Sequence, residues 1–150
     1  MPTLGADINI KEITINNQTL KFRIWDLAGQ PKFDVVRKQY FRGSVGAILM
    51  YDISESDSLP NLHNWVNQLD ENNLIKKIPI VVVGNKIDLR KESESNLITK
   101  KEGLEFVERL EGELGEERPK FFFESSAKDN INTSKIFKKL GEEVVKFIGS

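Results

Sequence analysis

Hydrophobic and polar residues alternate near the start of the chain, as they do in a strand with one buried face. Residues 8–15 follow this alternation with one slip of phase around Glu12, which suggests a β-bulge. The segment Asn16-Asn17-Gln18 favours a turn, and residues 20–25 then alternate regularly. Together these segments predict an N-terminal antiparallel hairpin.

Three later segments are apolar without alternation. They are Val45 to Tyr51, Ile78 to Val83 and the shorter Phe121 to Phe123. Continuous apolar runs are typical of strands that are covered on both faces, as in a parallel sheet.

Stretches with helical spacing lie between and after these runs, over residues 59–69, 104–110 and 136–148. Strands that alternate with helices predict a doubly wound α/β fold with a mostly parallel sheet. Polar segments predict loops over Lys91 to Asn96 and Gly112 to Pro119.

Composition narrows the function classes. The 150 residues contain 22 Lys and Arg against 23 Asp and Glu, so the formal net charge is -1 and gives no reason to propose a nucleic-acid partner. There is no cysteine, which excludes disulfides, thiolate metal sites and a cysteine that could carry a lipid. We therefore expect one cytoplasmic domain over residues 1–150 with no encoded membrane anchor.

Ligands of such folds bind at the carboxyl ends of the strands. Asp26-Leu27-Ala28-Gly29-Gln30 follows the second strand of the hairpin. Asp26 is placed to hold a hydrated Mg²⁺, Gly29 allows a backbone N–H to approach a phosphate, and Gln30 can orient a water. A strand that ends in a tight turn is the alternative interpretation.

The segment Gly84-Asn85-Lys86-Ile87-Asp88 follows the second apolar run. The two oxygens of Asp88 can accept from the N1–H and the exocyclic amine of guanine, a donor pair that adenine lacks. Asn85 can bond the base, and the stem of Lys86 can lie along its plane. Taken alone, the segment also suits an ordinary solvated turn.

Small residues follow the third apolar run in Glu124-Ser125-Ser126-Ala127-Lys128, where backbone amides can approach a carbonyl such as guanine O6. Near the start of the chain, the hydroxyl of Thr3 can ligate Mg²⁺ while its amide binds a terminal phosphate. Alone, the first segment also suits a helix start and the second a disordered terminus.

Together these motifs resemble the small GTPases of the Ras superfamily, most closely the Rab-like branches, over essentially the whole chain. The resemblance implies a P-loop NTPase-like fold, GTP or GDP with Mg²⁺, and a molecular switch in trafficking or signalling. It implies that Gln30 positions the hydrolytic water and that Gly29 senses the γ-phosphate. It also implies a guanine site made by Asn85, Lys86, Asp88, Ser126, Ala127 and Lys128.

The resemblance further implies two switch regions that meet regulators and effectors, near Thr3–Ile8 and Gly29–Tyr40. Thr3 belongs to the first switch, and with Asp26 it would organise the metal. Leu27 stands where Rab-like members commonly have threonine.

The family's phosphate-binding loop, G-x-x-x-x-G-K-[ST], is not found in these residues, because none of the ten glycines is followed by lysine. Measured against the resembled family, the chain begins inside the first switch, so the first strand and the P-loop are missing. We therefore expect an N-terminally truncated G domain whose GTPase activity as an isolated chain is in doubt. A split assembly of two polypeptides and a nucleotide-deficient interaction module are the open alternatives.

Overall fold

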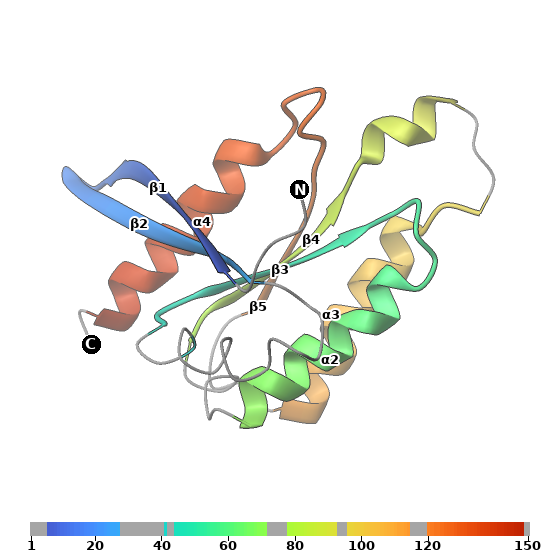
Figure 1. The fold of residues 1–150 in the computed structure, drawn as a ribbon, viewed down its shortest axis with the longest axis horizontal. Helices are drawn as coiled ribbons and strands as arrows, with labels where there is room; N and C mark the ends of the chain where they lie inside the picture. The colour runs from blue at the N-terminus through green and yellow to red at the C-terminus, as the bar shows by residue number, and fades with distance from the viewer. Residues whose placement is uncertain are drawn as a thin grey trace. The chain divides into compact units, whose positions relative to one another are not determined.

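The computed structural model describes residues 6–27, 41, 44–71, 78–92, 96–114 and 120–148. The chain divides into two compact units, residues 1–44 and residues 45–150. Within the described residues, the first unit contains a two-stranded antiparallel sheet and the second a three-stranded parallel sheet (Figure 1).

The first unit is built on the hairpin of β1 (Ala6–Ile15) and β2 (Gln18–Leu27), drawn in blue in Figure 1. The two turn residues, Asn16 and Asn17, have positive φ angles of 52° and 65°. Two-residue hairpin turns of type I′ require positive φ at both central residues, and asparagine tolerates this geometry better than most residues do. The predicted hairpin is confirmed.

The predicted bulge near Glu12 is wrong. Every residue of β1 faces one partner in β2, from Ala6 opposite Leu27 to Ile15 opposite Gln18. The hydrophobic alternation slips because Ile10 lies on the same side of the strand as Glu12, where its side chain is 59% exposed. The hairpin thus keeps a regular register and leaves the side chain of Ile10 exposed.

The second unit contains the parallel sheet, with strand order β3-β4-β5. Its strands are β3 (Ala47–Asp52), β4 (Ile80–Asn85) and β5 (Lys120–Glu124). The predicted apolar runs therefore form strands, and the α/β fold is confirmed.

Helices cover both faces of this sheet. In Figure 1, α2 (Ser58–Glu71) and α3 (Lys100–Leu114) lie on one side and α4 (Thr133–Ile148) lies on the other. Neighbouring residues of β5 point to opposite layers. The ammonium of Lys139 on α4 lies 4.4 Å from the centre of the Phe121 ring, whereas the Phe122 ring lies against Gly103 of α3.

The central strand β4 is fully covered, since residues 80–83 have no exposed surface. The prediction of coverage on both faces is therefore correct for β4. It is wrong for β3, where Met50 is 52% exposed while its neighbours Leu49 and Tyr51 are buried. β3 is an edge strand of this sheet, so its apolar run does not mean that every side chain in it is buried.

Both predicted loops begin too early. The 3-10 helix η2 (Ile87–Glu92) includes Lys91 and Glu92, and α3 continues past Gly112 to Leu114. Gly112 lies on an open part of the helix, where an added Cβ atom would meet nothing within 4 Å. Helix propensity alone penalises glycine by only about 1 kcal/mol, which packing elsewhere along α3 outweighs.

A tyrosine is buried between the sheet and α3. Tyr51 is 2% exposed, and its hydroxyl has no hydrogen-bond partner among the described residues. A Cβ atom at Gly84 would lie 2.6 Å from this hydroxyl oxygen, and one at Gly103 would collide with it and with Phe122. The two glycines therefore make the space that the tyrosine ring fills.

We predict that Tyr51→Phe raises the free energy of unfolding by about 1 kcal/mol, because it removes an unpaired buried hydroxyl and keeps the ring. Urea denaturation of the two proteins measures the difference. Gly84→Ala is the matched control and lowers stability, since its methyl group meets the tyrosine. A loss of stability in Tyr51→Phe would show that the hydroxyl has a partner.

Stability also falls at alkaline pH. Burial, with a smaller contribution from the Glu124 carboxylate, raises the pKa of Tyr51 from 10.0 to about 12. The folded chain therefore keeps a proton that the unfolded chain loses, and stability decreases as the pH rises from about 10 to 12. Urea midpoints across this range should fall less steeply in Tyr51→Phe. Equal slopes in both proteins would contradict this assignment.

Candidate functional site

The carboxyl ends of the three parallel strands meet at one edge of the second unit. Asp52 of β3 pairs with Asn85 of β4, and Gly84 of β4 pairs with Glu124 of β5. Ligands of open α/β sheets bind outside this edge. The turns that follow these strands carry two of the predicted motifs.

Backbone hydrogen bonds tie the turn after β4 to the turn after β5. The Ser125 N–H donates to the Gly84 carbonyl at 2.8 Å, and the Ile87 N–H donates to the Ser125 carbonyl at 3.1 Å. The two turns are therefore held at a fixed spacing by main-chain contacts on both sides of Asn85 and Lys86.

Side chains add a second set of contacts between the same turns. The Ser126 hydroxyl donates to Asp88 Oδ1 at 2.7 Å, and the Ser125 hydroxyl donates to Asn85 Oδ1 at 3.1 Å. Both serines are buried. Oδ1 is the oxygen of Asp88 that takes part in the contact with Ser126. The carboxylate is thus oriented through one oxygen and keeps acceptor capacity on the other.

Lys86 has a left-handed backbone with φ of 71°, which is uncommon for a residue with a side chain. Its ammonium lies 2.7 Å from Asp52 Oδ2, at the end of the neighbouring strand. Strained backbone of this kind persists where the surroundings hold it, and it is frequent at functional sites. Lys86 is therefore held by β4 through its backbone and by β3 through its side chain.

Asp52 is a charged anchor at this edge. Its Oδ1 accepts from the Ser54 N–H at 2.9 Å and from the Ser54 hydroxyl at 2.6 Å. Partial burial alone would raise the pKa of Asp52, but the bonds from Lys86 and Ser54 outweigh it and hold that pKa below its ordinary value. The same ion pair raises the pKa of Lys86. Both groups are therefore charged near neutral pH.

The turn after β5 closes on itself. Ser126 and Ile131 exchange two backbone hydrogen bonds of 3.2 and 2.8 Å, and the Asp129 N–H donates to the Ser126 hydroxyl at 3.0 Å. Ala127 and Lys128 are exposed at the front of this turn. Because Ser126 also bonds Asp88, the structure brings Asp88 and Ala127 to the same part of the sheet edge.

The predicted metal ligands, the predicted phosphate contact and the residue expected to orient the water all belong to the first unit. Thr3, Gly29 and Gln30 lie outside the described residues, and Asp26 is described only as a backbone position in β2, opposite Asp7. The predicted switch segment Gly29–Tyr40 also lies outside them. No group of three His, Cys, Asp or Glu side chains that could hold a metal occurs in the part of the chain that the structure describes.

Sequence reasoning missed Asp52, Arg90 and Asn132. The Arg90 guanidinium pairs with the Glu124 carboxylate, and the Asn132 side-chain amide donates to the Glu124 carbonyl at 2.7 Å. The position of Asp52 directly after an apolar run was a usable signal. Nothing local marks Arg90 or Asn132, because their partner is distant or is a main-chain atom.

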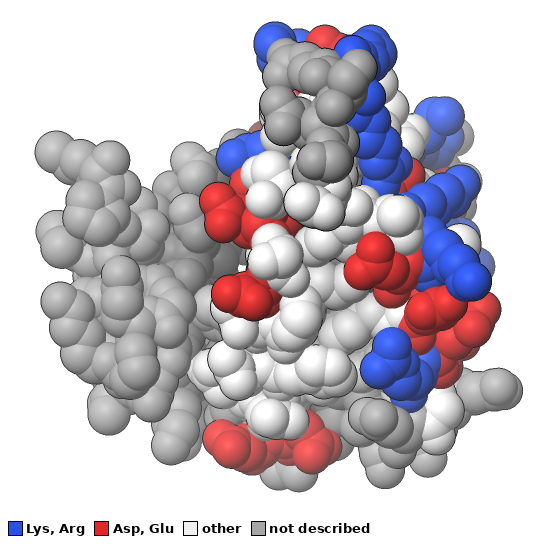
Figure 2. All heavy atoms as spheres, turned by 90° about the vertical axis from the view of Figure 1, so that its right-hand side faces the viewer, with Lys and Arg blue, Asp and Glu red and all other residues white. Residues whose placement is uncertain are grey.

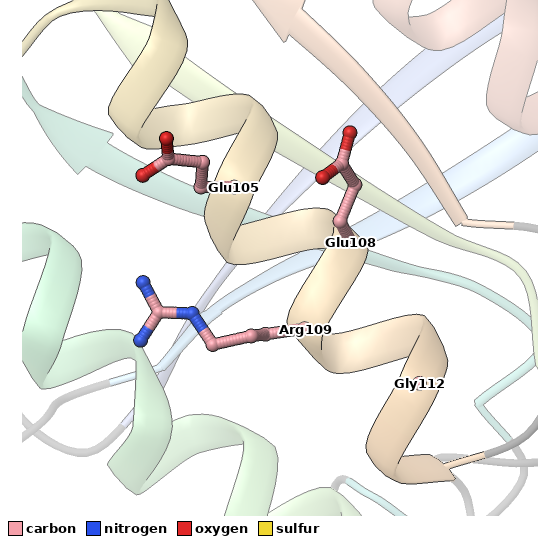
Figure 3. Close-up of a pocket in the computed structure, with 4 residues that line it drawn as sticks. All are labelled: Glu105, Glu108, Arg109 and Gly112. Atoms are coloured by element: carbon pink, nitrogen blue, oxygen red, sulfur yellow. The ribbon is translucent and has the colours of Figure 1, made fainter.

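One shallow, open pocket lies elsewhere. Its lining residues Glu105, Glu108, Arg109 and Gly112 all belong to α3 (Figure 3). The pocket uses none of the residues at the carboxyl edge of the sheet.

Basic and acidic side chains are interspersed on the face drawn in Figure 2, which thus shows no patch of a single sign. No described helix combines the length and apolar character that a membrane crossing requires.

Comparison with known proteins adds independent findings. The sequence profile described as the Ras family matches residues 1–146. The Ras-related protein Rab-12 of Homo sapiens is 33% identical over 144 residues, which cover 96% of this chain and 54% of that protein. The GTP-binding protein Rab-3D of Rattus norvegicus is 35% identical over 138 residues, covering 92% and 58%.

The Ras-related protein RABC1 of Arabidopsis thaliana is 38% identical over 140 residues, which cover 93% of this chain and 61% of that protein. The chain thus spans a little over half the length of these three curated relatives.

Proposed function

Because the chain belongs to the Ras family and is a Rab-like small GTPase in the general sense, we propose that the turns after β4 and β5 bind a guanine base. The observation that supports this most is the 2.7 Å hydrogen bond from Ser126 to Asp88. This bond joins the two turns that the base would have to contact at the same time.

Guanine fits the chemistry of these turns. In this proposal the Asp88 carboxylate accepts from guanine N1–H and from the exocyclic amine, while a backbone amide near Ala127 donates to O6. Adenine presents neither the same donor pair nor a carbonyl at that position, so it would leave Asp88 unpaired at a cost.

Three further residues complete the proposed base site. Lys86 would lay its methylene stem along the base plane. Asn85 would hold the neighbouring turn through Ser125, as it does in the described structure. Lys128 lies exposed beside Ala127, where its stem can cover the opposite face of the base.

For the whole protein we propose GTP hydrolysis to GDP and a switch role in trafficking or signalling. Gln30 would position the attacking water, and Gly29 would approach the γ-phosphate. Thr3 and Asp26 would hold Mg²⁺, which when bound neutralises charge on the phosphates. Regulators and effectors would meet the segments Thr3–Ile8 and Gly29–Tyr40.

We also propose that residues 1–150 act as one G domain. The polar carboxyl edge of the second unit would supply the base contacts, and the hairpin and its flanking residues would supply the switch. Cytoplasmic localisation stays a prediction from the sequence.

Calorimetric titration of the chain with GDP, GTP and ADP in the presence of Mg²⁺ tests the proposal. We expect guanine nucleotides to bind at least about a hundredfold more tightly than ADP, because a site built to bond a donor pair rejects a base that lacks it. Absence of GDP and GTP binding at millimolar concentration would contradict the proposal and favour an interaction module.

Asp88→Asn should exchange base preference from guanine to xanthine, since the C2 carbonyl of xanthine pairs with an amide donor. Competition between GDP and xanthosine diphosphate measures the change, expected at about a hundredfold or more in their affinity ratio. Asp129→Asn is the matched control, because Asp129 lies in the adjacent turn and bonds Lys91. Unchanged base preference in Asp88→Asn would refute the assignment of Asp88.

A further inference from the structure

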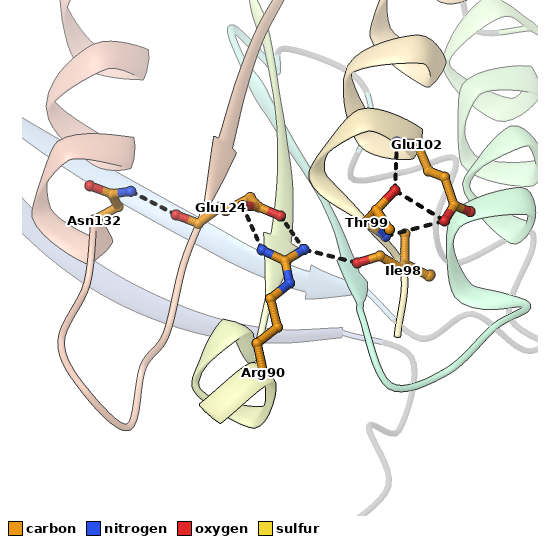
Figure 4. A network of polar contacts seen from close by, with 6 residues as sticks. All are labelled: Arg90, Ile98, Thr99, Glu102, Glu124 and Asn132. Atoms are coloured by element: carbon orange, nitrogen blue, oxygen red, sulfur yellow. Dashed lines mark hydrogen bonds and ion pairs between the residues drawn. The ribbon is translucent and has the colours of Figure 1, made fainter. Parts of the chain in front are cut away.

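A charged pair lies directly behind the proposed base site and joins the same two turns. Arg90 belongs to η2, two residues after Asp88, and Glu124 is the last residue of β5, directly before Ser125. Arg90 Nη1 donates to Glu124 Oε1 at 2.8 Å, and Nη2 donates to Oε2 at 2.6 Å (Figure 4). Two parallel bonds fix both the distance and the angle between the groups.

The pair is better shielded from water than a typical surface ion pair. The Arg90 side chain is 33% exposed and that of Glu124 is 11% exposed. Exposed ion pairs contribute little because water and salt screen them, whereas removing one partner of a shielded pair leaves a charge without compensation. The Glu124 carboxylate raises the pKa of Arg90 further, so the guanidinium stays charged.

Arg90 also reaches the third segment of this edge. Its Nη2 donates to the Ile98 carbonyl at 2.9 Å, and the Ile98 N–H donates to the Ile53 carbonyl at 2.9 Å, just after β3. The residue after Ile98 begins a capping box, in which the Thr99 hydroxyl accepts from the Glu102 N–H at 3.2 Å and Glu102 Oε1 accepts from the Thr99 N–H at 3.2 Å. The guanidinium is therefore held from two sides, by the end of β5 and by the segment that leads into α3.

Glu124 is in turn connected to the far end of the turn after β5. Its carbonyl accepts from Asn132 Nδ2 at 2.7 Å, and Asn132 follows Ile131, which pairs with Ser126. Figure 4 shows Arg90, Glu124 and Asn132 in one continuous line of contacts. A shift of Glu124 would consequently move the whole turn that carries Ala127.

We propose that Arg90 and Glu124 are positioning residues that fix the Asp88 carboxylate against the turn of Ser126, Ala127 and Lys128, and thereby set selectivity for guanine. The inference rests on the proposed guanine site. The pair acts through Asp88 and the turn, because the two side chains bond each other and the Arg90 guanidinium also bonds the Ile98 carbonyl. Correct spacing of acceptor and donor is what allows one base to bond both turns.

A second ion pair supplies a matched control. Lys91 and Asp129 join the same two segments, but by a single contact of 3.2 Å, and the Lys91 side chain is 74% exposed. Lys91→Ala therefore removes a cross-link between η2 and the turn after β5 without removing the shielded fork.

The test compares Arg90→Lys, Glu124→Gln and Lys91→Ala in the full chain. Arg90→Lys keeps the charge and loses the fork, and Glu124→Gln keeps the shape and loses the charge. Amide hydrogen exchange at Ile87 and Ile131 reports the spacing of the turns without nucleotide. Competition between GDP and inosine diphosphate, which lacks the exocyclic amine, reports selectivity.

In Arg90→Lys and Glu124→Gln we expect exchange at Ile87 and Ile131 to be about tenfold faster and the preference for GDP over inosine diphosphate to fall about tenfold. Exchange in the core of β4 should stay unchanged, and Lys91→Ala should match the wild type in both measurements. Those results support the proposal.

Two results would overturn it. One is exchange and base preference in Arg90→Lys and Glu124→Gln equal to those of Lys91→Ala. The other is an equal acceleration across β4, which would show a general structural role. If the unmodified chain binds no guanine nucleotide, the proposed function fails and the selectivity claim fails with it, while hydrogen exchange alone decides whether the pair fixes the turns.

Discussion

The second unit depends on a parallel sheet whose strands end at one edge. The central strand β4 is completely buried at residues 80–83, so its position is determined by packing on both faces. Its last residues, together with those of β3 and β5, then bring polar groups from distant parts of the chain into contact. Because a parallel sheet aligns strand ends in this way, residues separated by tens of positions can form one site without any deep cavity.

The sheet alone would leave the turns free to differ in spacing, and polar contacts restrict them. Main-chain bonds join Ser125 to Gly84 and Ile87, Ser126 bonds Asp88, and Lys86 pairs with Asp52. The Arg90–Glu124 fork adds a shielded contact one layer behind. These bonds share neighbouring residues, so each limits the motion that would weaken the others. An edge of this kind suits a planar ligand that must be contacted from two sides at once.

Local patterns in the sequence predicted the elements well and their partners poorly. The Asn16-Asn17 turn and the buried strand β4 were predictable because turn chemistry and apolar runs are local signals. The position of Asp88 after a buried strand, in order with the other motifs, was the basis for proposing a base site. The Arg90–Glu124 pair joins residues 34 positions apart, which only the register of the sheet brings together. The wrong prediction of a bulge has the same origin. Pairing across the hairpin kept the strand regular and left the side chain of Ile10 exposed.

The central claim is that two turns, after β4 and after β5, touch the same purine ring. A nuclear magnetic resonance titration of the isotope-labelled chain with GDP tests it most directly, with ADP as the comparison ligand. The account predicts that the amide resonances of Lys86 to Asp88 and those of Ser126 to Lys128 shift together along one binding curve with GDP. With ADP, neither set of resonances should shift. A response confined to one turn, or the same response to ADP, would contradict it.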